Sequence, residues 1–488
     1  MTCCSKWNLK SEKFHQESAP LPKTGRSIVL TTVKTHTYLS TNIQMSEVTQ
    51  NLSGAPLNRR QFLTRSLAAS TAFAVPNIIP ASALGRGGAV APSERIVMGA
   101  IGLGGRGSGD LGWMLGEADV QFVAVCDVRK ANREGAKNAV DGKNGNKDCA
   151  AYRDMRDLLG KHTEIDAMLI ATGDRWHTPA SILAMQAGKD VYCEKPGALT
   201  IAQGQALVAA TKRYGRVFQT GAQRASEANF IVAGELARQG KLGKVHTVYA
   251  HLGYLPDWPR VNAVLPPQPE PSKEELDWDL WLGPAPWRPY NPGFIPQYPS
   301  PGWYTQYDFA GGIPQWGSHT ILQCQLDLGL ADTSPVTYEY PKDLKGAGMT
   351  VHFANGLKLV AKCDGWRGSC GVKYEGPDGW VAAADGYEKP DVSSPSLLRD
   401  SKKLLQDYLA RNQRPLNHVR DFLNCVKSRR TPVTSAEVAH RTMTTNLIMD
   451  ICLDLKRDLK WDPVKQEFPG DDEANRLRSR AMREPWQV

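Results

Sequence analysis

The sequence feature that most constrains the fold is a glycine-rich turn that follows a short apolar run. Residues 95–101 form the run, which is typical of a buried parallel strand. Gly102, Gly104 and Gly107 then complete the pattern G-x-G-x-x-G. In this pattern the first glycine permits a tight turn, the second lets backbone N–H groups approach a diphosphate, and the third lets the next helix pack closely on the strand. The turn therefore predicts a Rossmann domain that binds a dinucleotide.

An acidic residue at the expected distance strengthens this prediction. A second apolar run, residues 120–126, ends at Asp127, which lies twenty residues beyond Gly107. An acid here accepts hydrogen bonds from the adenosine ribose and repels the 2′-phosphate of NADP, which favours NAD. Arg129 and Lys130 lie nearby, so NADP is the second option. The other interpretation is a structural glycine turn beside a surface aspartate. The residues expected to bind the cofactor at this turn are Gly102, Gly104, Gly105, Arg106, Gly107 and Asp127.

Alternating strands and helices continue beyond this turn. Residues 166–172 and 190–193 are predicted to be buried strands, with a helix over residues 179–187 between them. This order indicates an α/β fold with a doubly wound parallel sheet. Ligands bind outside the carboxyl ends of the strands in such a sheet. Polar residues 173–177 and 194–196 follow two of those ends, so we expect them to face the ligand.

Several longer motifs resemble the Gfo/Idh/MocA oxidoreductase family, which includes glucose–fructose oxidoreductase and inositol dehydrogenase. They are A-T-x-x-x-x-H at 171–177, AGKDVYCEKP at 187–196, WDLWLGPAPWRPYNP at 278–292, WGSH at 316–319 and REPW at 483–486. The resemblance implies a Rossmann domain over residues 94–222. It also implies a C-terminal α+β domain over residues 223–470 with a large, open, mostly antiparallel sheet, and a tail over residues 471–488. A sugar, inositol or related polyol as substrate and a homo-oligomeric assembly are implied as well.

The same resemblance implies two catalytic residues. Lys195 of the E-K-P motif matches a lysine that is catalytic or orients the substrate, and His319 matches the active-site histidine of the family. The structural alternatives are a solvated surface lysine and a buried core histidine. We expect the cofactor to contact Thr172, His177, Glu194 and Lys195, and the substrate to contact Lys195, Trp303, Gln315 and His319. We also expect a cis peptide bond before Pro196.

The sequence departs from the family pattern around the histidine. Many family dehydrogenases have an acid four residues before it, where this chain has Gln315, and often a second acid three residues after it, where this chain has Leu322. A carboxylate would stabilise an imidazolium, whereas glutamine adds no charge. We therefore expect His319 to be a weaker base than in those relatives, and Lys195 to do more of the proton transfer.

The N-terminal residues have the pattern of an export signal. Residues 58–64, NRRQFLT, contain paired arginines, and a small apolar stretch and the A-x-A site Ala81-Ser82-Ala83 follow. This order predicts a twin-arginine signal and linker over residues 58–90. We therefore expect a periplasmic or otherwise exported protein carried by the twin-arginine machinery, which transports folded proteins. Residues 1–57 are predicted to be an untranslated or disordered extension, with Met45 as the expected start.

Charge and composition exclude other classes of protein. Residues 1–85 contain nine lysines and arginines against three glutamates, and so hold +6 of the net charge of +9. The nearly neutral remainder argues against a nucleic-acid partner, because phosphate binding needs clustered cations. No apolar run reaches the roughly 20 residues of a spanning helix, and no cysteine or histidine spacing predicts a metal site.

The rest of the chain is predicted in outline. Strands are expected over residues 245–254 and 349–361, and an amphipathic helix is expected around residues 419–426. Thr434 and Glu437 form a capping box that opens a longer helix. The segment 255–302, rich in Pro and Trp, is expected to cover the substrate or to pack on a neighbouring subunit. The charged tail from Asp471 is expected to lie along the surface.

These features predict an NAD(P)-dependent oxidoreductase that acts on a CH–OH group of a sugar, a polyol or a sugar derivative. Export adds a constraint, because free NAD is scarce outside the cytoplasm. A tightly held cofactor that is recycled internally suits that compartment. The alternative is a non-catalytic or redox-neutral relative, of lyase or glycosidase type, that binds sugars.

Overall fold

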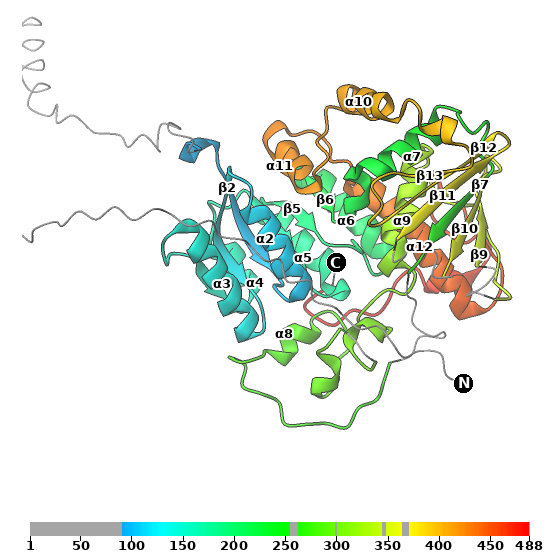
Figure 1. Ribbon diagram of the computed structural model, residues 1–488. Coiled ribbons are helices and arrows are strands. Elements are labelled where there is room, and N and C mark those ends of the chain that lie inside the picture. The colour runs from blue at the N-terminus through cyan, green and yellow to red at the C-terminus, as the bar shows by residue number, and fades with distance from the viewer. Residues whose placement is uncertain (1–89, 254–261, 298–299, 344–347, 364–369, 488) are drawn as a thin grey trace, which may run out of the picture. The chain divides into compact units, whose positions relative to one another are not determined.

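The computed structural model describes residues 90–253, 262–297, 300–343, 348–363 and 370–487. The predicted twin-arginine segment, residues 58–64, lies outside the described residues. Two sheets organise the described part of the chain, each with its own helices (Figure 1). The predicted fold class is confirmed: a doubly wound parallel sheet is followed by a mixed, mostly antiparallel one.

The first sheet has six parallel strands in the order β3-β2-β1-β4-β5-β6. Its strands are β1 (Ile96–Ile101), β2 (Val120–Cys126), β3 (Ala150–Tyr152), β4 (Ala167–Ile170), β5 (Asp190–Cys193) and β6 (Phe218–Thr220). In β1, Met98 and Ala100 belong to one hydrophobic core, whereas Ile101 belongs to the core on the other face. Because both faces are buried, the strand is an unbroken apolar run rather than an alternating one.

Helices connect these strands, as the alternation predicted. They are α2 (Gly105–Leu115), α3 (Lys130–Asn144), α4 (Met155–Lys161), α5 (Asp174–Gln186) and α6 (Ile201–Tyr214). The predicted start of α5 at Pro179 was wrong, because the helix begins at Asp174 and contains Pro179 in its interior. The earlier start brings residues 174–177 into the first turn of a helix, directly after β4.

The second sheet has eight strands in the order β13-β12-β11-β7-β10-β9-β8-β14. Its strands are β7 (Thr247–His251), β8 (Thr337–Tyr338), β9 (Met349–His352), β10 (Lys358–Lys362), β11 (Gly371–Gly376), β12 (Gly379–Ala384), β13 (Asp391–Val392) and β14 (Leu459–Lys460). All its pairings are antiparallel except that of β7 with β10.

Residues 349–361 are a hairpin and not the single strand that their composition predicted. β9 and β10 pair antiparallel, and Gly356 between them has φ +86°. The Leu357 N–H donates to the Asn355 side-chain oxygen at 3.0 Å. Asn-Gly is a strong turn signal, so the reversal was encoded in the sequence.

Helices α7 (Ala228–Arg238), α9 (Pro314–Asp327) and α12 (Ala436–Leu455) share one hydrophobic core with this sheet and cover one of its faces (Figure 1). The other helices of this part are α8 (Trp278–Leu282), α10 (Ser401–Asn412), α11 (His418–Ser428) and α13 (Asp472–Arg476). The predicted capping box is displaced by one residue. Ser435 caps α12 by accepting from the Val438 N–H, whereas the Thr434 hydroxyl donates to the Thr220 carbonyl at 2.7 Å.

The Pro- and Trp-rich segment forms a small aromatic core of its own. Trp278 stacks on Trp281 with ring centroids 4.6 Å apart, and Phe294 and Phe309 complete the cluster. Trp258 and Tyr298 of this segment lie outside the described residues. The core fixes the neighbouring residues 295–297, which line the cavity described below.

The tail departs from the prediction that it lies along the surface. Ala474 is fully buried, and the Trp486 side chain near the end of the chain is only 6% exposed. The tail therefore packs into the fold as well as running over it.

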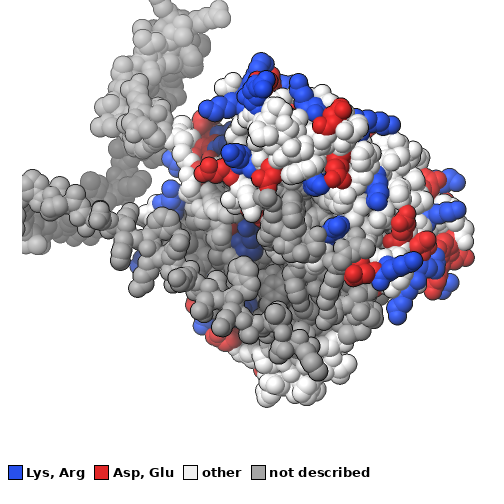
Figure 2. Space-filling view, turned by 45° about the vertical axis from the view of Figure 1, so that its right-hand side comes forward, with Lys and Arg blue, Asp and Glu red and all other residues white. Residues whose placement is uncertain are grey.

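The described surface carries mixed charge. On the face that Figure 2 displays, lysine and arginine are interspersed with aspartate and glutamate, so a broad basic patch for a phosphate backbone is not gathered there. Among the described residues, every helix is too short or too polar to span a bilayer.

Candidate functional site

The glycine-rich turn has the geometry that its sequence predicted. Gly102 has φ +81°, and a Cβ there would overlap the Thr172 backbone. A Cβ on Gly107 would lie far inside the contact distance of the Gly102 carbonyl oxygen, so α2 packs on the turn without space for a side chain. By contrast, a Cβ on Gly105 would meet nothing within 4 Å. The turn is therefore tight on its protein side and open on the other.

Asp127, at the end of β2, faces this turn. Its carboxylate accepts hydrogen bonds from the Leu103 N–H at 2.6 Å and the Arg129 N–H at 2.8 Å. Burial raises the pKa of Asp127, and these two backbone donors oppose that shift. The acid is thus fixed beside the turn, where the sequence analysis expected it to meet a ribose.

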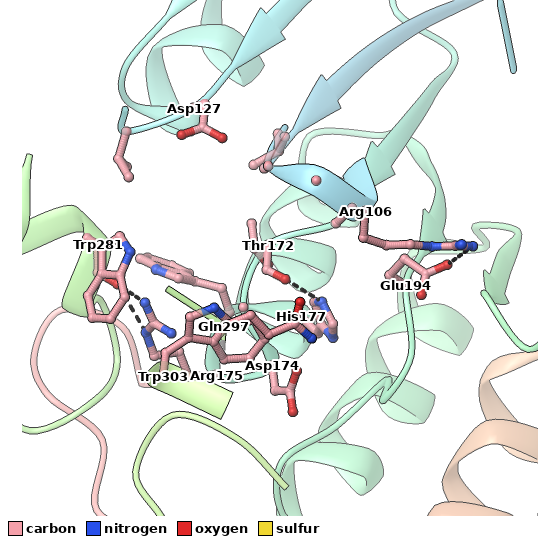
Figure 3. A pocket seen from close by; sticks show the side chains of 18 of the residues that line it. Arg106, Asp127, Thr172, Asp174, Arg175, His177, Glu194, Trp281, Gln297 and Trp303 are labelled. Carbon is pink, nitrogen blue, oxygen red and sulfur yellow. Dashed lines mark hydrogen bonds and ion pairs between the residues drawn. The ribbon is translucent and has the colours of Figure 1, made fainter. Parts of the chain in front are cut away.

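One cavity of about 630 Å³ joins the predicted cofactor and substrate residues. This volume is typical of small-molecule and cofactor sites. Most of the predicted site residues line it, namely Gly102, Gly104, Gly105, Arg106, Asp127, Thr172, His177, Glu194, Lys195, Trp303 and His319. Gly107 is buried against the turn and does not line the cavity. Figure 3 shows Asp127 and Glu194 on opposite sides of this space.

Glu194 belongs to a buried acidic pair beside α2. The Arg106 guanidinium lies 3.0 Å from Glu194 (Figure 3) and 2.8 Å from Asp110. Asp110 has no exposed surface, and its burial, followed by the Glu194 charge, raises the pKa of Asp110 to about 8. Asp110 thus keeps its proton to a higher pH than an exposed aspartate does, and Arg106 lies between the two acids.

Lys195 extends from the end of β5 to helix α9. Its amino group donates to the Gln315 carbonyl oxygen at 3.0 Å and lies 5.6 Å from the centre of the Trp316 ring. The peptide bond between Lys195 and Pro196 is cis, as predicted. Lys195 therefore bridges the two domains at the cavity wall.

Gln315 lies beneath the cavity and not at its surface. It is fully buried, and its side-chain amide donates to the Tyr304 carbonyl at 2.9 Å. Gln315 is absent from the residues that line the cavity, so the expected direct contact with a substrate does not fit its placement. Its backbone carbonyl instead accepts the hydrogen bond from the Lys195 amino group.

His319 is 4% exposed and lines the cavity one helical turn beyond Gln315. Burial, followed by the charges of Lys195 and Arg224, lowers the pKa of His319 well below its ordinary value. Its Nδ1 has no hydrogen-bond partner among the described residues. The ring is therefore neutral at physiological pH and weakly basic, the direction expected from the missing acid.

His177 uses both ring nitrogens within the protein. Nδ1 lies 2.6 Å from the Pro196 carbonyl and Nε2 lies 3.0 Å from the Thr172 carbonyl (Figure 3). His177 thereby ties the loop after β4 to the loop after β5. The Thr172 hydroxyl is buried and has no partner among the described residues.

Two buried carboxylates that the sequence analysis did not assign hold the approach to α9. Asp174 accepts from the Gly311 N–H at 3.1 Å, and Asp450 of α12 accepts from the Gly312 and Ile313 N–H groups at 3.1 and 2.9 Å. Burial raises the pKa of Asp174, and the positive charge of His177 opposes that shift. Together, these two carboxylates position the segment that leads into α9, and thereby also His319 on that helix.

Arg175 and Trp176 belong to residues 173–177, which were expected to face the ligand but were given no individual role. The Arg175 guanidinium donates to the Trp281 and Leu282 carbonyls and stacks on the Trp281 ring (Figure 3). Burial lowers the pKa of Arg175 to about 9. Both residues line the cavity, as their position directly after a parallel strand predicted.

The open side of the turn fits a dinucleotide. A Cβ on Gly104 would have the Asn132 side-chain nitrogen at 3.9 Å as its nearest neighbour, and the first N–H groups of α2 have no intrahelical acceptor. Such N–H groups and the positive end of the helix dipole suit a diphosphate. With the buried Thr172 hydroxyl and Asp127, they supply the donors and the acceptor that a pyridine nucleotide needs.

Comparisons with protein families match two parts of the chain. Residues 96–222 match the model described as oxidoreductase family, NAD-binding Rossmann fold, and residues 246–488 match that of the C-terminal alpha/beta domain of the same family. Residues 96–222 are therefore an NAD-binding Rossmann domain.

Curated relatives are identical to this chain at about a quarter of the aligned positions. The inositol 2-dehydrogenase of Salmonella typhimurium is 27% identical over 191 residues, which are 38% of this chain and 53% of the relative. A glycosyl hydrolase family 109 protein of Stenotrophomonas maltophilia is 27% identical over 281 residues, 56% of each chain. This chain thus spans about half the length of the curated relatives it matches.

Solved structures share the fold at lower identity. The WlbA dehydrogenase of Bordetella pertussis, solved with NADH and UDP-GlcNAcA, has a TM-score of 0.53 at 16% identity, over 76% of this chain and 98% of that one. The myo-inositol 2-dehydrogenase of Lactobacillus plantarum has a TM-score of 0.50 at 17% identity, over 75% and 99%.

Proposed function

Because the chain belongs to the Gfo/Idh/MocA oxidoreductase family, we propose that it uses NAD to oxidise a CH–OH group of a sugar, a polyol or a sugar derivative. The observation that carries the proposal is that one cavity contains both the glycine-rich turn with Asp127 and the side chains of Lys195 and His319. The names of the relatives, inositol 2-dehydrogenase among them, favour a polyhydroxylated substrate.

The cofactor is held by the open face of the turn. The N–H groups at the start of α2 bind the diphosphate and Asp127 accepts from the adenosine ribose hydroxyls. The carboxylate disfavours a 2′-phosphate, so NAD is the preferred cofactor over NADP. When bound, NAD supplies a nicotinamide that accepts a hydride from the substrate carbon and can return it.

Lys195 and His319 have different roles at the reacting hydroxyl. Although the sequence led us to expect Lys195 to do more of the proton transfer, we assign the proton of the reacting hydroxyl to His319, because its ring is neutral and its Nδ1 has no partner among the described residues. The Lys195 ammonium hydrogen-bonds the same oxygen and stabilises the negative charge that develops on it. The cations that lower the pKa of His319 also make it release that proton readily. Trp303, at the cavity wall, offers an aromatic face to the apolar face of a sugar ring.

The first experiment identifies the cofactor and the substrate class. The mature protein is analysed by native mass spectrometry for bound NAD or NADP and is then mixed with a panel of sugars, inositols and uronic acids while the nicotinamide absorbance is followed. We expect one bound NAD per chain and reduction by at least one member of the panel. Protein that neither contains nor takes up a pyridine nucleotide would refute the proposal.

A second candidate function is a redox-neutral reaction. Oxidation of a CH–OH carbon two positions from the carbon that bears the leaving group is followed by elimination, addition of water and return of the hydride. The weakly basic His319 and the relatives named glycosyl hydrolase family 109 favour it. Such a cycle acidifies a neighbouring C–H bond. Deuterium incorporation into substrate or product in D₂O without net NADH would identify it, whereas stoichiometric NADH without exchange would identify a dehydrogenase.

We further propose that the protein is exported with its cofactor already bound. The paired arginines of residues 58–64 support this, since twin-arginine export carries folded proteins. A cofactor that stays bound through both halves of a cycle needs no supply of free NAD outside the cytoplasm. Release of NAD on gentle dialysis of the mature protein would count against internal recycling.

A further inference from the structure

The end of the chain packs against the wall of the cavity. The Trp486 side chain is 6% exposed and lines the cavity, although it follows an exposed stretch of the tail. Its ring contacts the Trp176 ring of α5 edge to face, with centroids 4.8 Å apart. The guanidinium of Arg156, a residue of α4, lies 4.7 Å from the centre of the Trp486 ring. Three segments far apart in the sequence therefore converge at this aromatic corner.

On its α4 side, the corner adjoins the part of the site that is expected to hold adenosine. The cavity residues after β2 include Asp127, the proposed ribose ligand, and those after β3 are residues 153–155. Arg156, which packs on Trp486, continues that second set. Because β3 and β2 form one edge of the parallel sheet, the loops after them are those expected to face the adenosine half of a dinucleotide. Trp176 follows β4, on the other side of β1.

Trp486 brings an unused hydrogen-bond donor to this corner. Its indole Nε1 is buried and has no partner among the described residues, whereas the Trp176 indole donates to the Leu280 carbonyl at 2.9 Å. A buried indole N–H usually has a partner. Adenine and its ribose carry several acceptors, so a bound adenosine supplies the missing partner.

The backbone of the tail is anchored just before this residue. The Arg483 N–H donates to the Pro284 carbonyl at 2.9 Å, and the Arg483 side chain donates to the Gly283 carbonyl at 3.0 Å and pairs with Asp279. Gly283 itself packs on Trp176, since a Cβ there would overlap the indole ring. The anchor therefore holds Trp486 against Trp176 through contacts that do not depend on the cavity being filled.

We propose that Trp486 is a cofactor-binding residue and that the tail closes the adenosine end of the cleft, so that it slows the release of NAD. The inference rests on the proposed function and adds a structural cause for a cofactor that stays bound. It attributes the retention of NAD to Trp486 and its anchor at Arg483 as well as to the glycine-rich turn.

The experiment measures dissociation rates on the full mature protein. Radiolabelled NAD, ADP-ribose or nicotinamide mononucleotide is bound and then chased with excess unlabelled ligand. For Trp486→Ala we expect release of NAD and of ADP-ribose to accelerate at least tenfold, with release of nicotinamide mononucleotide unchanged, because that probe lacks adenosine. Trp486→Phe should give a smaller increase, and Arg483→Ala, which loosens the anchor, an increase of several-fold. A protein that lacks only Gln487 and Val488 is the matched control and should release all three probes at the wild-type rate.

The possible outcomes distinguish failure of this inference from failure of the proposed function. If folded Trp486→Ala and Trp486→Phe release NAD within twofold of the wild-type rate, the inference is wrong and the proposed function stands. Faster release of all three probes would mean general loosening of the fold, which also overturns it. If the wild-type protein binds neither NAD nor ADP-ribose, the proposed function fails first and the inference with it. Circular dichroism of each variant establishes that it is folded, and Arg483→Ala tests the proposal independently of the aromatic packing.

Discussion

Asp110 is a buried acid at a position where the fold does not require an acidic side chain. Its pKa is raised to about 8 from 3.8, first by burial and then by the Glu194 charge. Between these pH values the native protein holds a proton that the unfolded chain releases, so the free energy of unfolding falls as the pH rises. Asparagine has nearly the same shape, and it can accept from Arg106 while donating to Glu194.

We therefore expect Asp110→Asn to raise the free energy of unfolding at pH 7 by on the order of 1 kcal/mol or more. The gain should grow from about pH 4 to about pH 8 and level off above, because the wild-type acid then ionises in both states. Urea unfolding at a series of pH values measures it. Asp141→Asn is the control of opposite sign: the Lys137 amino group lowers the pKa of Asp141, so this substitution should give no gain. A gain for Asp110→Asn that shrinks as the pH rises would contradict the assignment.

Lys195 is the residue on which the proposed chemistry depends most directly. Replacing it with alanine removes the ammonium group next to the reacting oxygen, so we expect kcat to fall at least about 10²-fold. NAD affinity should change only a few-fold, because the diphosphate is held by the turn. Single-turnover reduction of the bound cofactor, compared with Lys358→Ala at the exposed start of β10, provides the measurement. Turnover within threefold of the wild type would exclude Lys195 from the reaction.

At the scale of single elements, the junction of β1 and α2 offers a matched pair of glycines. A Cβ on Gly107 would overlap the Gly102 carbonyl, whereas a Cβ on Gly109, two residues further along the same helix, would meet nothing within 4 Å. Gly107→Ala should push α2 away from the strand and weaken NAD binding at least tenfold. Gly109→Ala should leave binding unchanged and raise stability by roughly 0.5–1 kcal/mol, as alanine does in helices. Calorimetric titration with NAD and thermal melting test both; equal effects of the two variants would show that the close approach is unimportant.

Elements with strong local signals were predictable from the sequence. β2 and β5 have the predicted bounds because both are buried apolar runs that end at polar residues. The hairpin at residues 349–361 was missed although Asn355-Gly356 encodes it, because the flanking residues share one strand-like composition. The start of α5 was missed because proline was taken for a first helical residue, whereas Asp174 begins the helix.

The candidate site was predictable only where a motif spans it. The glycine-rich turn, Asp127, Lys195 and His319 meet at one cavity as their motifs suggested. Asp174 and Asp450 could not be assigned, since their partners are backbone N–H groups at Gly311–Ile313, which no spacing links to them. Trp486 belongs to the same class, because its position depends on Trp176 and Arg156 from two other helices.

For the whole molecule, the N-terminal pattern predicts its destination. Replacing Arg59 and Arg60 together with lysine should abolish recognition by the twin-arginine machinery while leaving the mature part unchanged. We expect the variant precursor to accumulate in the cytoplasm, and the wild-type protein to be found in the periplasmic fraction with its signal removed. Arg65→Lys, at an arginine of the same segment outside the pair, is the matched control. Equal export of both variants would argue against a twin-arginine signal.

The packing of Trp486 also couples the tail to the nucleotide cleft. Its ring lies against Trp176 and Arg156 and lines the cavity, so the tail cannot detach without removing part of the wall. A nucleotide that binds only the closed cleft therefore holds the tail in place, and it should slow proteolytic cleavage next to Arg483.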